Sequence, residues 1–178
     1  MNVSLDGFAD HTVAVVTDDE LHDFFSRLLD SVDMMVFGRV TYELMESAWP
    51  HVPENPNSTK ALVDFAERIN SLPKIVVSRS LEKTSWNNSR IVRELPVNEI
   101  TALKNKPGKN ISVGGLSVCQ ALSKHGLIDD YWLVVQPVVI RRGKRLFNNL
   151  SGHFHLELME AEKLASGVVA LHYSTLKG

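Results

Sequence analysis

Apolar residues recur along the first two thirds of the chain with two alternating spacings. From residue 18 to 31 they recur every three or four positions behind a capping box that runs from Thr17 to Glu20, which predicts a helix. Continuous apolar runs at residues 34–37 and 74–78 have the length of strands buried on both faces, as in a parallel sheet. Helical spacing also predicts helices around residues 42–45 and over residues 58–72, 97–106 and 116–126.

The spacing changes in the last third of the chain. Residues 131–140 have the pattern of one long strand, or of two strands joined at Pro137, and residues 154–164 and 167–175 alternate as an antiparallel pair. A short strand opens the chain at residues 1–5, short enough that its natural start would lie upstream, and three prolines within residues 49–57 predict a loop. Strands that first alternate with helices and then follow one another predict an α/β fold whose late strands are antiparallel. We expect one domain over residues 1–178.

Three predicted strands are followed by similar short segments. Each segment combines small or hydroxylic residues, twice with an arginine, at residues 37–41, 77–80 and 113–117. Because the carboxyl ends of neighbouring parallel strands face one crevice, these three segments are candidates for one binding site. Three ordinary strand-to-helix turns with surface arginines are the alternative, and the spacing alone does not separate the two.

The chemistry of these segments suits a ligand that carries several phosphates. Gly114 and Gly115 would let a phosphate approach the free N–H groups at the start of the next helix. Arg39 and Arg79 would add forked, permanently charged donors. Hydroxyl groups would come from Thr41, Ser78 and Ser117. A dinucleotide with a 2′-phosphate is one such ligand.

Composition and charge narrow the function classes. The net charge of −2 gives no basic surface for nucleic acid, and no apolar run is long enough to cross a membrane, so we expect a cytoplasmic protein. Cys119, the single cysteine, has no partner for an internal disulfide and is expected in the core. His153 and His155 would share a face of a strand, but a metal hydrolase would rest on this pair alone; we expect no metal.

Several motifs then occur in a fixed order over nearly the whole chain: Ser4-Leu5-Asp6-Gly7-Phe8, Phe37-Gly38-Arg39-x-Thr41-Tyr42-Glu43, Val76-Val77-Ser78, Val113-Gly114-Gly115, Gly126-Leu127-Ile128-Asp129-Asp130, Pro137-Val138-Val139 and Gly143-Lys144-x-Leu146-Phe147. In this order the chain resembles the dihydrofolate reductase-like superfamily, and within it the branch that contains the reductase domain of bacterial riboflavin biosynthesis. The resemblance implies a three-layer α/β/α fold on a mixed, mostly parallel central sheet with antiparallel C-terminal strands. It also implies NADPH as hydride donor and commonly a homodimer.

The resemblance assigns cofactor-binding roles by position. Gly38, Arg39 and Thr41 match the family's first loop for the pyrophosphate and the 2′-phosphate. Ser78 and Arg79 match the loop that holds the adenosine 2′-phosphate. The glycine turn under the pyrophosphate corresponds to Gly114, Gly115, Leu116 and Ser117, and the segment beside the nicotinamide runs from Val3 to Asp10.

Catalytic and substrate residues are also assigned from the resemblance. Asp6 and Asp23 are the candidate catalytic carboxylates, although His22 competes with Asp23 for the place of the family's buried carboxylate. Tyr42 and Trp49 are candidate walls of the substrate pocket. The substrate implied is a pyrimidine similar to 5-amino-6-(5-phosphoribosylamino)uracil, or a pterin. A nucleotide-binding homodimer of the same fold without catalytic activity is the alternative.

The chain departs from the family's pattern at one loop. Ile140-Arg141-Arg142-Gly143 stands where the family usually has Leu-Gly-x-Gly. We therefore expect this loop to be altered.

Overall fold

The computed structural model describes residues 1–9, 16–148, 153 and 155–176. The chain forms two compact units, one made of residues 19–118 and the other of residues 1–18 together with 119–178. Each unit has its own sheet of four strands. The expectation of one domain over residues 1–178 stays a prediction. Among the described residues there is no helix of the length and apolar character that a membrane span requires.

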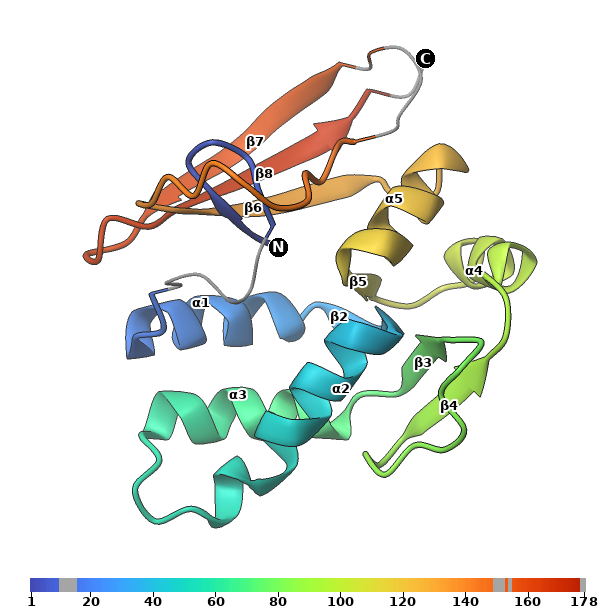
Figure 1. Ribbon diagram of the computed structural model, residues 1–178, viewed down its shortest axis with the longest axis horizontal. Helices are drawn as coiled ribbons and strands as arrows, with labels where there is room; N and C mark the ends of the chain where they lie inside the picture. The colour runs from blue at the N-terminus through green and yellow to red at the C-terminus, as the bar shows by residue number, and fades with distance from the viewer. Residues whose placement is uncertain (10–15, 149–152, 154, 177–178) are drawn as a thin grey trace. The chain divides into compact units, whose positions relative to one another are not determined.

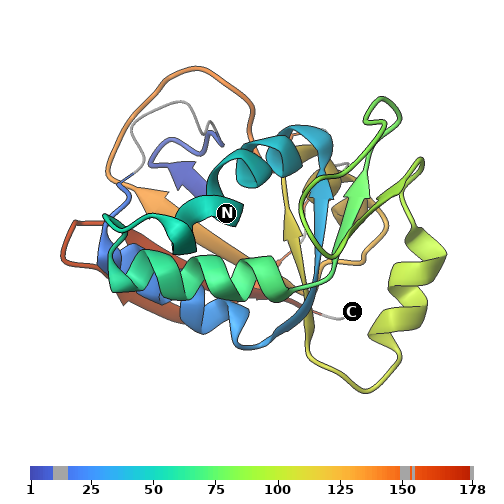
Figure 2. The same cartoon turned by 90° about the horizontal axis from the view of Figure 1, so that it is seen from below.

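Residues 19–118 are built on a parallel sheet, and we call them the parallel unit (Figure 2). The strand order is β4-β3-β2-β5. The central strands β2 and β3 contain the apolar runs at residues 34–37 and 75–77, as expected for strands covered on both faces. Their bounds are Val32–Gly38 for β2, Lys74–Val77 for β3, Ser89–Val92 for β4 and Asn110–Gly114 for β5.

The helices of the parallel unit confirm the predictions from apolar spacing to within a few residues. They are α1 (Asp19–Leu29), α2 (Arg39–Ala48), α3 (Lys60–Ser71) and α4 (Val97–Lys104). The prediction of a loop at residues 49–57 was wrong for its first part, which is the 3₁₀ helix η1 (Trp49–Glu54). Pro50 lies in the first turn of η1, where a helix makes no use of a backbone N–H, and Pro53 lies inside this short helix.

Aromatic side chains form the centre of the parallel unit's core. Phe37 on β2, Tyr42 on α2 and Trp86 before β4 are all buried together. The Phe37 and Trp86 rings are stacked with centroids 6.2 Å apart, and the Trp86 Nε1–H donates to Asn70 at 2.7 Å. These contacts fix α2 and the segment before β4 against the central strand.

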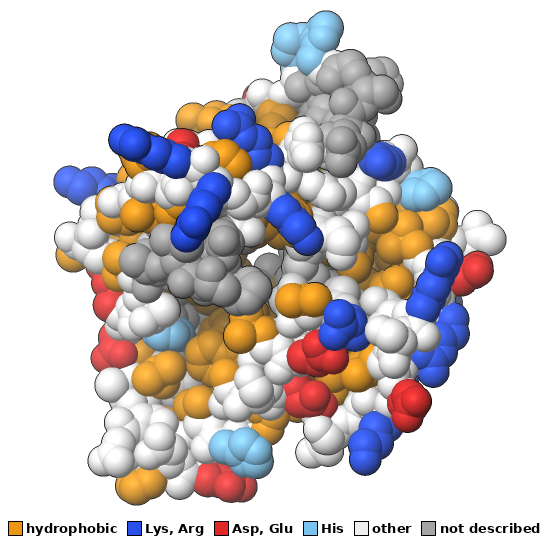
Figure 3. All heavy atoms as spheres, in the orientation of Figure 1, with side chains coloured by type: hydrophobic (Ala, Val, Ile, Leu, Met, Phe, Trp, Pro, Cys, Tyr) orange, Lys and Arg blue, Asp and Glu red, His pale blue; other side chains and the backbone are white. Residues whose placement is uncertain are grey.

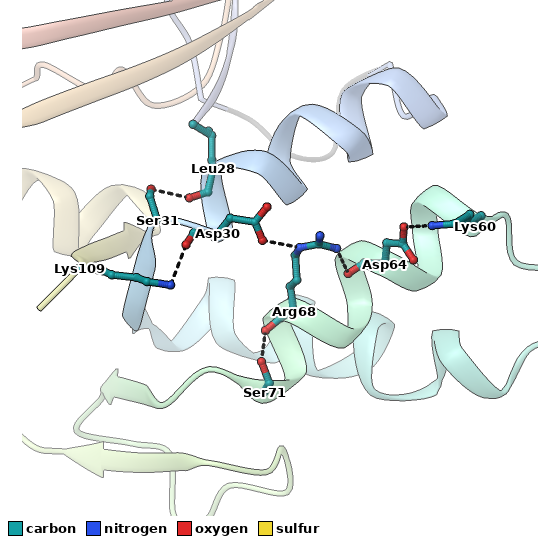
Figure 4. A network of polar contacts seen from close by, with 8 residues as sticks. All are labelled: Leu28, Asp30, Ser31, Lys60, Asp64, Arg68, Ser71 and Lys109. Atoms are coloured by element: carbon teal, nitrogen blue, oxygen red, sulfur yellow. Dashed lines mark hydrogen bonds and ion pairs between the residues drawn. The ribbon is translucent and has the colours of Figure 1, made fainter.

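A polar network lies at the edge of the parallel sheet where strands β2 and β5 begin (Figure 4). Arg68 on α3 donates to the Asp30 carboxylate after α1 at 2.8 Å and to the Asp64 carbonyl at 3.1 Å. Lys109, just before β5, donates to the Asp30 carbonyl at 2.9 Å, and Lys60 pairs with Asp64. The network therefore joins α1, α3 and the start of β5 far from the carboxyl ends of the strands.

The remaining residues form a mixed sheet, and we call them the mixed unit. Its strand order is β1-β6-β8-β7 (Figure 1). Strand β1 (Asn2–Ser4) is parallel to β6 (Asp130–Gln136). Strands β7 (Leu156–Lys163) and β8 (Val169–Thr175) form the predicted antiparallel pair, and β8 is also antiparallel to β6. Strand β6 ends before Pro137, because proline has no N–H for the ladder. Helix α5 (Leu116–Lys124) begins in the parallel unit and continues into the mixed unit.

Candidate functional site

The carboxyl ends of three neighbouring strands meet at one edge of the parallel sheet. Strand β2 lies between β3 and β5, and in the register Gly38 is opposite Val77 while Phe37 is opposite Gly114. The segments that follow these residues therefore leave the sheet side by side. This confirms the expected convergence of the three strand ends.

Glycines let two of these segments pack closely. A Cβ built on Gly115, whose φ is +99°, would lie 2.6 Å from Thr41 Oγ1, and one on Gly38 would lie 3.1 Å from Ser117 Oγ. A Cβ on Gly114 would lie 2.5 Å from the Phe37 ring. The structure thus brings Gly38, Thr41, Gly115 and Ser117 together in a cradle that has no room for further side chains.

Two helices begin at this cradle. Helix α2 starts at Arg39 with Gly38 as its N-cap, and no side chain caps it; helix α5 starts at Leu116. The first N–H groups of a helix carry partial positive charge and are suited to bind an anion. Arg39 lies on the exposed side of α2, where its guanidinium pairs with Glu43 at 2.8 Å.

The segment after β3 is held by its own hydroxyl group. Ser78 is buried, and its Oγ accepts hydrogen bonds from the N–H groups of Ser80 at 3.3 Å and Leu81 at 2.9 Å. Arg79, which follows Ser78 in the chain, is exposed. The Ser78 hydroxyl therefore shapes the turn, and Arg79 is the cation that this turn presents to solvent.

Arg93 is a residue that sequence reasoning missed. Its Nη1 donates to the carbonyls of Ser78 at 3.2 Å, Arg79 at 3.4 Å and Leu81 at 2.6 Å. Strand β4 pairs Val92 with Val77, which puts Arg93 beside the turn. Arg93 directly follows β4, and its place beside the turn depends on β4 being the neighbour of β3 in the sheet.

Tyr42 does not form the wall of a pocket, so that prediction was wrong. Its side chain is fully buried in the core, and its hydroxyl donates to Glu46 at 2.6 Å and accepts from the Trp86 N–H at 3.2 Å. Burial, followed by the bond to Glu46, raises the pKa of Tyr42. Trp49 is partly buried on the same core, with its ring 4.6 Å from that of Phe65.

His22 and Asp23, the two candidates on α1 for the family's buried carboxylate, lie in different surroundings. Asp23 is exposed. His22 is buried, with its ring centroid 5.8 Å from that of Trp49 and 6.0 Å from that of Phe65. His22 is therefore part of the aromatic core, whereas Asp23 stays a predicted catalytic residue that faces solvent.

Asp6 in the mixed unit binds backbone groups. Its carboxylate accepts from Ser4 Oγ at 2.6 Å, from the Arg141 N–H at 2.9 Å and from the Ile140 N–H at 3.3 Å. The hydrogen bond from Ser4 is the main cause that lowers the pKa of Asp6. Because a carboxylate held ionised is a poor proton donor at neutral pH, the geometry argues against Asp6 as a catalytic acid.

The mixed unit also contains Val3, Cys119 and the pair His153 and His155. Val3 is buried and opposite Val135 on β6, while Asp10 lies outside the described residues. The rings of His153 and His155 have centroids 5.8 Å apart, and the described part of the chain holds no group of three or more His, Cys, Asp or Glu that could bind a metal. Cys119 is buried, and burial raises the pKa of its thiol to about 11.

Comparison with known proteins gave one family model and one curated relative. The model of the RibD C-terminal domain family matches residues 1–170. The curated relative is the uncharacterised protein YyaP of Bacillus subtilis (strain 168), which is 29% identical over 150 residues, or 84% of this chain and 77% of that protein.

Solved structures share the fold at low sequence identity. A putative riboflavin biosynthesis protein from Shewanella sp. PV-4 has a TM-score of 0.72 at 22% identity, over 99% of this chain and 97% of that one. A pyrimidine reductase-like protein from Corynebacterium diphtheriae has a TM-score of 0.68 at 16% identity, over 99% and 90%. RibD of Acinetobacter baumannii has a TM-score of 0.70 at 14% identity, over 99% of this chain and 56% of RibD. This likeness confirms the predicted α/β fold class of the dihydrofolate reductase type.

Proposed function

Because the chain belongs to the RibD C-terminal domain family, we propose that it is a reductase that transfers hydride from NADPH to a small heterocyclic substrate. The observation that carries the proposal is the meeting of the three strand ends at one edge of the parallel sheet. The cradle there is suited to a pyrophosphate because two helices start beside it, and the glycines Gly38 and Gly115 allow the two helix starts to lie close together.

NADPH would supply the hydride, and this chain's residues would bind and orient it. The helix starts at Arg39 and Leu116 would receive the pyrophosphate, with Thr41 and Ser117 as hydroxyl partners. Arg79, on the turn shaped by Ser78 and Arg93, would pair with the adenosine 2′-phosphate. The resemblance adds Val3 and Asp10 as cofactor-binding residues.

The proposed substrate is a pyrimidine similar to 5-amino-6-(5-phosphoribosylamino)uracil or a pterin. The pyrimidine is favoured by the fold shared with a pyrimidine reductase-like protein. With Tyr42 in the core and Asp6 bound to backbone N–H groups, Asp23 is left as the candidate proton donor. Trp49 is left as the candidate aromatic contact for the ring of the substrate.

We also propose a second copy of this chain as a partner. Strand β7 is at the edge of the mixed sheet, and it exposes Leu158 by 52% and Met159 by 56%. An edge strand with exposed apolar side chains is suited to pair with another chain. Sedimentation analysis should give the mass of a dimer, and Met159→Lys should shift it toward the monomer.

The cofactor proposal is tested by titration with NADPH and NADH. The protein should bind NADPH much more tightly than NADH, and the double variant R39A/R79A should weaken NADPH about 100-fold or more while it changes NADH little. Arg90→Ala is the matched control, because Arg90 is exposed on β4 and pairs with Glu99. Equal losses for both nucleotides would contradict a role in 2′-phosphate recognition. Binding without oxidation of NADPH by any pyrimidine or pterin would favour the alternative of a nucleotide-binding homodimer without activity.

A further inference from the structure

Residues 4–9, which start at the last residue of β1, form a closed turn that we call the N-terminal turn. The Ser4 N–H donates to the Phe8 carbonyl at 2.8 Å, and the Gly7 N–H donates to the Ser4 carbonyl at 2.9 Å. The buried Ser4 hydroxyl accepts from the Phe8 N–H at 3.0 Å and donates to the Asp6 carboxylate at 2.6 Å. The Ser4 hydroxyl therefore orients the Asp6 carboxylate within the turn.

The N-terminal turn is attached to residues 138–145, which follow β6 and which we call the facing loop. The Leu5 N–H donates to the Val138 carbonyl at 2.9 Å, so the contact between β1 and β6 continues beyond the ends of the two strands. The Ala9 N–H donates to the Lys144 carbonyl at 2.8 Å. Backbone hydrogen bonds therefore join the two segments on both sides of Asp6.

Asp6 is the side chain that joins the same two segments. Its Oδ2 accepts from the Arg141 N–H at 2.9 Å, and its Oδ1 accepts from the Ile140 N–H at 3.3 Å. Arg141 has a φ of +62°, in the region that favours glycine, and consecutive N–H groups beside such a residue can point at one anion. In this protein that anion is the Asp6 carboxylate, so Asp6 supports a backbone conformation of the facing loop that is otherwise strained.

Two large apolar side chains are exposed where these segments meet. Leu5, which precedes Asp6, is 68% exposed, and Val139, which precedes Ile140, is 54% exposed. In Figure 3 hydrophobic and basic side chains lie next to one another over the mixed unit. Ligands commonly bind beyond the carboxyl ends of parallel strands, and apolar side chains there are suited to hold a flat ring.

We propose that Asp6 is a positioning residue that holds Leu5 against the nicotinamide end of the cofactor by fastening the N-terminal turn to the facing loop. This inference rests on the proposed function, in which residues 3–10 lie beside the nicotinamide of NADPH. It differs from the catalytic role first assigned to Asp6, because Asp6 acts through the backbone that it binds and transfers no proton. A turn held in one conformation keeps the ring in the orientation that hydride transfer requires.

The test compares NADPH with 2′-phospho-ADP-ribose, which carries the same adenosine and phosphates but no nicotinamide. In calorimetric titrations of the whole chain, the wild type should bind NADPH more tightly, because only NADPH carries the ring that Leu5 contacts. Asp6→Asn keeps the shape of the side chain but replaces one acceptor oxygen with an NH₂ group, which cannot accept from the facing loop. The variant should bind NADPH about tenfold more weakly and 2′-phospho-ADP-ribose unchanged.

Hydrogen exchange without nucleotide tests the attachment by itself. Asp6→Asn should speed exchange at the Leu5 and Ala9 amides, which donate to the facing loop. Glu157→Gln is the matched control, because it removes one exposed carboxylate of the mixed unit. It should change neither the exchange at these amides nor the ratio of the two nucleotide affinities.

Three results would overturn the inference. The first is unchanged exchange at Leu5 and Ala9 in Asp6→Asn, which would show that Asp6 does not fasten the turn. The second is wild-type affinity of this variant for NADPH. The third is an equal loss for NADPH and 2′-phospho-ADP-ribose, which would indicate a general loss of structure. Failure of the proposed function itself looks different, because the wild type would then bind neither nucleotide, and the positioning role would fall with it.

Discussion

The ammonium nitrogen of Lys74 lies 4.3 Å from the centroid of the Trp86 ring. Lys74 is 1% exposed, and its Nζ donates to three backbone carbonyls, of Leu72 at 2.7 Å, Asn70 at 3.2 Å and Asn87 at 3.4 Å. Burial lowers the pKa of Lys74 to about 8. A buried cation at the start of β3 thus depends on carbonyl groups and an aromatic face.

This lowered pKa predicts a pH dependence of stability. Between about pH 8 and pH 10 the unfolded chain binds a proton at Lys74 that the folded chain has released, so the free energy of unfolding rises with pH through this window. Lys74→Met removes the titration. In denaturant unfolding, the free energy of unfolding of the wild type should rise relative to that of the variant by roughly 1–3 kcal/mol from pH 7.5 to pH 10.

A control separates this effect from general alkaline titration. Lys60→Met also removes one lysine, but one whose side chain is 86% exposed, so it reports the effect of losing an exposed lysine over the same range. If Lys74→Met and Lys60→Met follow the same course with pH, the predicted effect of burial on Lys74 is contradicted.

Glu46 is predicted to stabilise the segment before β4 through its ionised form. Its Oε1 accepts from Tyr42 Oη, Ser85 Oγ and the N–H groups of Ser85 and Trp86, at 2.6 to 3.0 Å. Burial alone would raise the pKa of Glu46, but the hydrogen bonds from Ser85 and Tyr42 outweigh it and lower that pKa. Glu46→Gln should lower the free energy of unfolding by about 1–2 kcal/mol at pH 7.

The loss should shrink as the pH falls. A carboxylate with a lowered pKa stabilises the fold above its ordinary pKa of about 4.3, and that contribution disappears as it is protonated. Unfolding curves at pH 7 and pH 3.5 check this. Glu43→Gln, one turn earlier and paired with Arg39 on the exposed side, should cost less than about 0.5 kcal/mol. Equal effects of the two substitutions would contradict the assignment.

Gly115→Ala tests the cradle directly. Its Cβ would lie 2.6 Å from Thr41 Oγ1 at a φ of +99°, so the variant should lose about 2–3 kcal/mol of stability and bind NADPH more weakly. Gly126→Ala is a matched control, because Gly126 also has a positive φ, +64°, but a Cβ there would meet nothing within 4 Å. The control should lose about 1 kcal/mol and keep its NADPH affinity. Similar NADPH affinities in both variants would argue against the cradle.

Arg93→Met is predicted to loosen the turn after β3. Loss of the bonds to the Ser78, Arg79 and Leu81 carbonyls should speed hydrogen exchange at the Ser80 and Leu81 amides, which donate to Ser78 Oγ. If Arg79 on this turn pairs with a 2′-phosphate, NADPH should bind about tenfold more weakly and NADH unchanged. Arg90→Met is the control, because Arg90 lies on β4, three residues before Arg93, and pairs with Glu99. Unchanged exchange in Arg93→Met would show that the turn does not need Arg93.

The sequence predicted the regular elements well, because helices and buried strands differ in apolar spacing over many residues. Residues 18–31 and 34–37 fell within about two residues of the bounds of α1 and β2. The spacing of apolar residues does not show how deeply a side chain is buried. For this reason Tyr42 was assigned to the wall of a pocket, although it lies in the core. Proline content predicted a loop at η1, where the first turn of a helix accepts proline.

The candidate site was predicted in part. The convergence at Gly38, Ser78 and Gly114 followed from one rule about parallel strands. The hydrogen-bond partners of Asp6 could not be predicted, because Ile140 and Arg141 lie more than 130 residues away in sequence. Arg93 was missed because its role depends on β4 being the neighbour of β3. Long-range hydrogen bonds leave no periodic trace in a sequence.

Strand β1 pairs with β6, and the Met1 amino group donates to the Trp132 carbonyl across 131 residues. During synthesis, β1 is therefore made before the parallel unit, but it has no partner until the ribosome has completed residues 130–136. The parallel unit, which lies between β1 and β6 in the sequence, is contiguous, so its internal contacts do not depend on the completion of β6. Contacts of such sequence separation slow folding, so we expect closure of the mixed sheet, rather than formation of the parallel unit, to limit the rate at which the chain becomes native.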